Sequence, residues 1–137
     1  MAANKKFTFG PVALSTTTTT NILNPGTTTG GVASTGGVYA NLLIIVRHIR
    51  VVNKTNAAAF FALWKGATGA NTAGTEFVAG GAATAGALNA NTGISVAANS
   101  FFDWYGEVPF FTADFLVGGA GTATALTIQG EGELGVA

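Results

Sequence analysis

Hydrophobic residues are most continuous between positions 39 and 53, where the chain reads YANLLIIVRHIRVVN. This dense run of leucine, isoleucine and valine predicts a strand near the middle of a sheet. In its second half apolar and polar residues alternate, which places Ile49 and Val51 on one face and His48 and Arg50 on the other. We therefore expect a central strand that contributes much of the core and carries a separate polar face.

A second apolar stretch follows at positions 57–65 (AAAFFALWK), after a turn-forming Asn-Lys-Thr-Asn segment at 53–56. The pattern predicts a strand that forms a hairpin with the preceding one. Alternation sorts its residues into two faces, Ala59, Phe61 and Leu63 against Phe60, Ala62 and Trp64. Because both faces are apolar, we expect one to meet the core and the other to meet a neighbour.

Shorter strand-like segments, separated by glycine-rich stretches, occupy much of the remaining chain at 75–79, 94–96, 100–108 and 115–117. The segment at 122–134 alternates with period two, which places Leu126, Ile128 and Leu134 inward and Thr127, Gln129, Glu131 and Glu133 outward. We count seven or eight short strands in all and find no helical periodicity of useful length.

The N-terminal third carries weaker signals. Residues 1–10 are predicted to form a flexible arm, and the threonine-rich segment at 11–23 favours an extended peripheral strand, with a low-complexity linker as the alternative. Together with the downstream strands, this pattern predicts a single all-β domain over residues 11–137. The expected architecture is an antiparallel β-sandwich of jelly-roll or immunoglobulin-like type.

Composition changes the picture of the surface. Of the 137 residues, 48% are hydrophobic and only 9% are charged, against roughly 25% charged in ordinary soluble domains. The net charge is zero, so nothing favours nucleic acid or an anionic membrane, and no apolar run approaches the ~20 residues of a membrane span. A surface with so little charge is expected to be covered by other subunits, in a homo-oligomer such as a dimer or trimer.

The inventory of reactive side chains is small: one histidine, two aspartates, four serines and no cysteine. His48 lies within a predicted strand, and no serine sits in a nucleophile-elbow motif. Glu131 and Glu133 share a strand face, but two carboxylates alone are a weak calcium signal. The glycine runs match neither a phosphate loop nor a dinucleotide fingerprint. We therefore expect no catalytic, cofactor or metal site.

The residues that remain for function are aromatic and charged, and we take them as candidate contacts with other chains. They are Phe60, Trp64, Phe101, Trp104, Tyr105, His48, Arg50, Glu131 and Glu133. Exposed Trp64, Trp104 and Tyr105 could instead stack on sugar rings, whereas filling core or inter-subunit space is the expected role. The charges either pair across neighbouring strands or subunits, or form two independent solvated edges.

Several stretches also resemble small β-sandwich virion proteins of tailed bacteriophages, a group that includes capsid decoration proteins. They are IIVRHIRVVNKT, FFALWKGATGANTAGTEF, VAANSFFDWYG and LTIQGEGEL. The resemblance implies a non-enzymatic coat component, commonly oligomeric, that docks on a capsid or tail lattice, most often the capsid surface. The N-terminal residues have two lysines but no sustained apolar run after them, so we expect synthesis in the host cytoplasm without a signal peptide. The alternatives are a tail or neck component of such a virion and a carbohydrate-binding or adhesive module.

Overall fold

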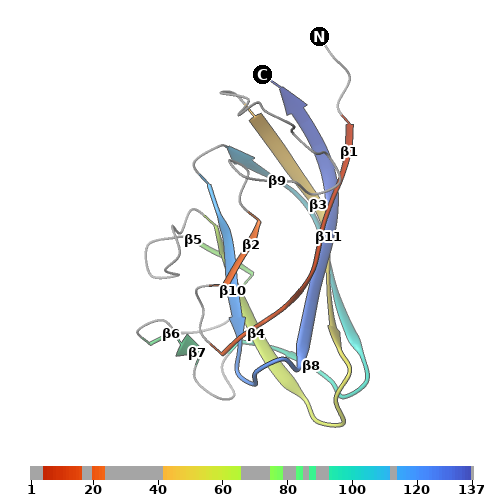
Figure 1. Ribbon diagram of the computed structural model, residues 1–137, viewed down its shortest axis with the longest axis vertical. Coiled ribbons are helices and arrows are strands. Elements are labelled where there is room, and N and C mark those ends of the chain that lie inside the picture. The colour runs from red at the N-terminus through yellow and green to blue at the C-terminus, as the bar shows by residue number, and fades with distance from the viewer. Residues whose placement is uncertain are drawn as a thin grey trace.

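The computed structural model describes residues 5–16, 20–23, 42–65, 75–78, 83–84, 87–88, 93–111 and 114–136. Over these residues the chain is all-β, and they include no helix. Most strands belong to two antiparallel sheets, which form two layers in Figure 1. The short strands β6 (Ala83–Thr84) and β7 (Ala87–Leu88) pair only with each other.

The first sheet has four strands in the order β1-β11-β3-β9. Their bounds are β1 Lys5–Ala13, β11 Leu126–Val136, β3 Leu42–Asn53 and β9 Phe101–Phe111. The apolar strand β3 lies between β11 and β9 along nearly its whole length. This confirms the prediction of a central strand. Pairing on both sides leaves β3 no exposed apolar edge with which another chain could aggregate.

The second sheet has the order β2-β10-β4-β5, and β8 also pairs with β4. Its strands are β2 Thr20–Leu23, β10 Leu116–Ala120, β4 Ala59–Lys65, β5 Thr75–Val78 and β8 Ile94–Val96. β8 pairs with the first half of β4 and β5 with its second half. The two short strands therefore follow each other along one edge of β4, while β10 occupies the other edge.

Strand pairing across the two sheets is nested in sequence. β1 pairs with β11, β2 with β10, β3 with β9, and β4 with β5 and β8. Each successive pair thus lies inside the previous one along the chain. Successive pairs alternate between the sheets: β1 with β11 and β3 with β9 belong to the first sheet, and β2 with β10 and β4 with β5 and β8 belong to the second.

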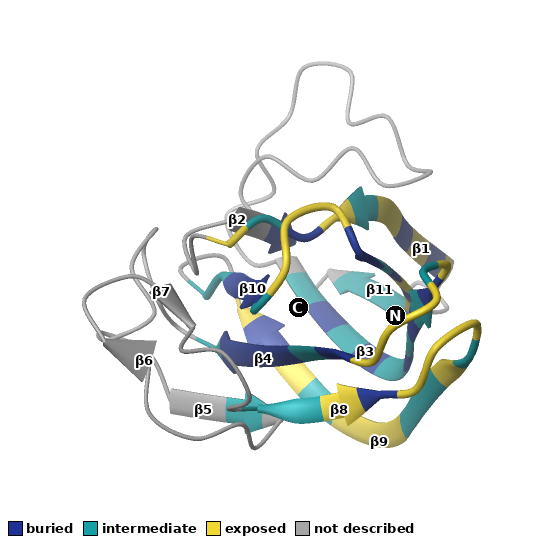
Figure 2. Cartoon of the chain, turned by 90° about the horizontal axis from the view of Figure 1, so that it is seen from below, coloured by how far each residue is buried: buried dark blue, intermediate teal, exposed yellow. Residues whose placement is uncertain are grey.

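The core lies between the sheets and takes residues from both. Ile49 and Val51 of β3 are buried in it, together with Phe61 and Leu63 of β4. In Figure 2, β4 is mostly dark blue, and dark blue alternates with teal along β3. The predicted faces of β3 and of the closing strand β11 are confirmed, since Leu126 and Ile128 are buried there and Gln129 and Glu131 are exposed.

The opposite face of β4 is apolar as well, as the alternation predicts. Ala62 and Trp64 are buried there with Val117 of β10, and Phe60 and Phe115 pack against them. Trp64 is only 7% exposed. β4 therefore contributes to two hydrophobic clusters, one on each side of its sheet.

The predicted hairpin between the two most apolar strands is wrong. β3 and β4 belong to different sheets, so the segment between them forms a corner. Asn53 is buried at this corner, where its amide nitrogen donates to the carbonyls of Ala57 (2.8 Å) and Val96 (3.0 Å). Its side-chain oxygen accepts hydrogen bonds from the backbone N–H and the hydroxyl of Thr55. One amide thus holds the crossing between the sheets, a long-range role that a local turn signal does not reveal.

The N-terminal prediction also needs correction. Residues 5–10, expected in a flexible arm, form the first part of β1 and pair with β11. Phe7 and Phe9 are buried in the core, and this burial explains why the segment joins the sheet. Gly10 has a φ of +81° at a register shift in β1, a conformation that glycine adopts without strain. The single peripheral strand predicted over 11–23 is divided in the structure, since residues 11–13 end β1 and residues 20–23 form β2, and both are edge strands. Residues 17–19 lie outside the described ranges.

Candidate functional site

The outer face of the first sheet, which we call the charged face, gathers most of the predicted charged residues. One cross-strand row runs through all four strands, from Thr8 to Glu131, His48 and Tyr105. The next row places Gln129 beside Arg50 and Arg50 beside Asp103. Because directly opposed side chains in a sheet lie within contact distance, these rows bring charges together from distant parts of the chain.

His48 lies at the centre of the first row. Its Nε2 is 2.9 Å from Oδ1 of Asp103, and its Nδ1 is 3.5 Å from Oε1 of Glu131. The ring also stacks on Tyr105, with centroids 4.6 Å apart and planes inclined by 13°. Both ring nitrogens therefore face carboxylates, and the imidazole bridges β9 and β11 across β3.

Arg50 makes a two-pronged contact with the same aspartate. Its Nε donates to Oδ1 of Asp103 at 2.7 Å and its Nη2 to Oδ2 at 2.8 Å. Hydrogen bonding from Arg50, aided by His48, holds the pKa of Asp103 well below its usual range, and the pKa of Arg50 is raised by the same contact. The guanidinium also lies 4.5 Å from the ring centre of Phe101. Both oxygens of Asp103 are thus fully engaged.

Arg47 occupies an irregularity in β3 that the alternation pattern did not predict. Relative to β11, Arg47 is an extra residue, since His48 pairs with Glu131 and Val46 with Gly132. Relative to β9 the extra residue is on β9, where Gly106 and Glu107 both lie opposite Arg47. It contacts Glu107 at 3.3 Å and Glu133 at 3.4 Å. Hydrogen bonding to Glu133 raises the pKa of Arg47. Both arginines of the charged face are thus paired with carboxylates, one on each side of the irregularity, while the Nε of Arg47 is buried without a hydrogen bond.

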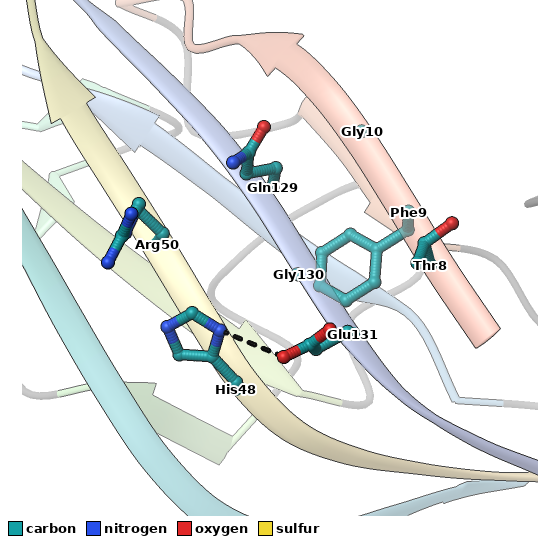
Figure 3. A pocket seen from close by; sticks show the side chains of 8 residues that line it. All are labelled: Thr8, Phe9, Gly10, His48, Arg50, Gln129, Gly130 and Glu131. Carbon is teal, nitrogen blue, oxygen red and sulfur yellow. Dashed lines mark ion pairs between the residues drawn. The ribbon is translucent and has the colours of Figure 1, made fainter. Parts of the chain in front are cut away.

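A shallow hollow of about 300 Å³ lies on this face between β1, β11 and β3. Figure 3 shows the residues that line it and the ion pair between His48 and Glu131 beside it. It is lined by Thr8, Phe9, Gly10, His48, Arg50, Gln129, Gly130 and Glu131. Its lining is largely polar, and no group of three or more metal-binding side chains occurs among the described residues.

The predicted aromatic contacts divide into two groups. Phe101 and Tyr105 are 56% and 71% exposed on the charged face, whereas Trp104 points to the inner side, where its ring lies 4.9 Å from that of Phe77. Trp64 is buried on the second sheet, with Phe60 beside it. The three rings considered for sugar stacking therefore do not form one exposed surface. The reason is alternation along β9, which sends Trp104 and Tyr105 to opposite faces.

Four residues that belong to this face were not among the residues predicted from the sequence: Arg47, Asp103, Glu107 and Phe111. Asp103 shares the face of Phe101 and Tyr105, so the period-two pattern could have found it. Phe111, 55% exposed, lies beyond Pro109, where the predicted strand was ended. The predicted pairing of charges across strands is found for His48 with Glu131, while Arg50 contacts Asp103 instead of either glutamate.

Comparison of the chain with protein-family models, with curated proteins and with solved structures gave no match in any of the three. Within the described ranges, the chain has no helix with the length and apolarity that a membrane crossing requires. The interpretation of the charged face therefore depends on its own geometry.

We expect Arg50 and Asp103 to be energetically coupled in a pH-dependent way. Alanine variants at each position, alone and together, should be non-additive in urea denaturation at pH 7. Since folding lowers the pKa of Asp103, the stabilisation is fully present above the ordinary aspartate pKa of about 4 and is lost as the pH falls below it. A parallel cycle of Arg50→Ala with Glu133→Ala should be additive, because Glu133 contacts Arg47. Additivity between Arg50 and Asp103 at pH 7 would contradict the assignment.

Proposed function

We propose that the chain is a jelly-roll β-sandwich acting as a structural component of a virion, with no enzymatic activity of its own. A jelly roll has two sheets and eight strands in two Greek keys. The nested pairing supports this type, with β5 and β8 sharing the position beside β4. An immunoglobulin-like sandwich instead distributes its strands as ABED and CFG, so its first strand does not pair with its last.

The charged face is the observation that carries the functional proposal. Its arginines and its histidine each have a carboxylate partner within the face, so most of its ionic groups keep a partner when the face is covered. Beside them, Phe101, Tyr105 and Phe111 expose large apolar surfaces on one strand. Paired charge next to exposed aromatics is typical of surfaces that another protein covers. A chain with 9% charged residues fits the same role.

The resemblance to tailed-phage virion proteins suggests which kind of assembly the chain joins. We propose a capsid decoration or minor capsid protein that associates with copies of itself and docks on the shell protein, without nucleic acid, membrane or cofactor. A tail or neck component would use the same kinds of contact, and its position in the particle distinguishes the two.

The test is quantitative mass spectrometry of gradient-purified particles from cells that make the chain together with its shell protein. We expect the chain to co-purify at a constant ratio to the shell subunit. Negative-stain labelling would then separate heads from tails. Absence of the chain from washed particles, or a ratio that varies between preparations, would contradict a structural role.

A further inference from the structure

Strand β9 combines a free sheet edge with the most exposed aromatic side chains. It pairs with β3 on one side, and no described strand pairs with its other side. The large hydrophobic residues that are exposed among the described ones are Phe101, Tyr105 and Phe111, and all three belong to β9. A long apolar edge of this kind is a ready template for pairing with another strand.

The two ends of β9 match each other in sequence. The strand reads FFDWYGEVPFF, with Gly106 in the middle and two phenylalanines at each end, while the three residue pairs between them differ. Two copies placed antiparallel about a two-fold axis at Gly106 would set Phe101 opposite Phe111 of the second copy. The same operation sets Tyr105 opposite Glu107, which joins a phenol donor to a carboxylate acceptor. A surface that matches itself under a two-fold axis is what a symmetric dimer requires.

We propose that two copies of this chain associate edge to edge through β9, around a two-fold axis at Gly106. The inference rests on the proposed function and specifies its self-association. The charged residues of β9 already have partners, since Arg50 and His48 hold Asp103 and Arg47 lies 3.3 Å from Glu107. Two copies therefore bring no uncompensated aspartate or arginine of this cluster into the contact.

Side chains, more than the main chain, hold this contact together. Pro109 has no N–H to donate, and Asp114 already accepts the N–H of Phe111 at 2.9 Å. Main-chain pairing is thus confined to the central part of the strand. The two Phe101–Phe111 contacts, one on each side of the axis, act as the anchors, in keeping with the dominant role of aromatic residues at interfaces.

The chain contains no cysteine, so introduced thiols test the geometry directly. Phe101→Cys and Phe111→Cys are made as separate full-length variants and treated with a short bismaleimide cross-linker, alone or mixed in equal amounts. In the proposed dimer, position 101 lies nearest to 111 of the second copy, where the two aromatic side chains meet. A disulfide is not required, because both main-chain groups of Phe111 are bonded to Asp114 and the strands do not pair there. Two copies of position 101 are about 34 Å apart along the strands. We expect a cross-linked dimer in the mixture and essentially none in either variant alone.

A charge at an anchor gives an independent measurement. Phe101→Glu should weaken self-association, measured by analytical ultracentrifugation, by about tenfold or more while leaving the circular dichroism spectrum unchanged. Gln129→Glu, exposed on the same face but on β11, is the matched control and should change association little.

The outcomes separate this contact from the proposed function. A protein that is monomeric at all concentrations, or a mixture that forms no more cross-linked dimer than each variant alone, overturns the β9 contact. Binding of that same protein to particles at a constant ratio would leave the structural role intact. Absence from particles together with efficient mixed cross-linking would overturn the structural role and leave the dimer.

Discussion

Ile49→Ala is expected to lower the free energy of unfolding by about 2–5 kcal/mol, the usual range for removing a large aliphatic side chain from a packed core. Ile49 is 1% exposed at the middle of β3, and its cross-strand neighbours are Gly130 of β11 and Trp104 of β9. Gly130 has no side chain of its own, and the ring of Phe9 lies over it, so only a shift of that packed ring could fill the space left by the isoleucine. Urea denaturation of the purified variant measures the loss.

Ile45→Ala is the matched control, because it removes the same atoms from the same strand. Ile45 lies on the half-buried outer face, opposite Glu133 and Pro109. Its substitution should cost clearly less than that of Ile49. Equal losses at the two positions, or a negligible shift for Ile49, would mean that β3 does not have the register described above.

Asn53→Asp is expected to destabilise the fold by about 3–5 kcal/mol, because it leaves a buried charge without a compensating partner. The new carboxylate would still accept from Thr55, but it would face the carbonyl oxygens of Ala57 and Val96 without a proton to donate. The effect should therefore reach both sheets, since this amide holds the corner between them. Thermal and urea denaturation at neutral pH would measure it.

Asn56→Asp provides the control for this second prediction. Asn56 is in the same turn but exposed, so the same chemical change there should alter stability by no more than about 0.5 kcal/mol. If the two substitutions had the same effect, the crossing between β3 and β4 would not depend on the buried amide. The alternative would then be a corner fixed mainly by the hydrophobic residues on either side.

The corner and the charged face both affect the position of the exposed aromatic residues of β9, because β3 connects them. β3 joins the corner to the charged face, and β9 lies against it along most of its length. Pairing with β3 holds Phe101, Tyr105 and Phe111 in register along an edge with which no described strand pairs. Contact residues that are held in place before binding lose less conformational freedom when a partner covers them.

The sequence alone determined the all-β class, most of the strands and the faces of β3, β4 and β11. These properties are local, because alternate residues of a strand point to opposite sides whatever the strand is paired with. The inward positions of Ile49, Phe61 and Ile128 could therefore be assigned from the pattern of apolar residues. The same period placed His48 and Arg50 together on the charged face.

Only the tertiary structure decided which strands meet. Pairing of β1 with β11 and of β3 with β9 joins segments that are far apart in sequence, and the alternation pattern contains no signal for the partner of a strand. For this reason the hairpin expected between β3 and β4 became a corner held by Asn53. The ionic partner of Arg50, the burial of Trp64 and the free edge of β9 likewise follow from the order of strands across the sheets, which is set by the packing of the whole core.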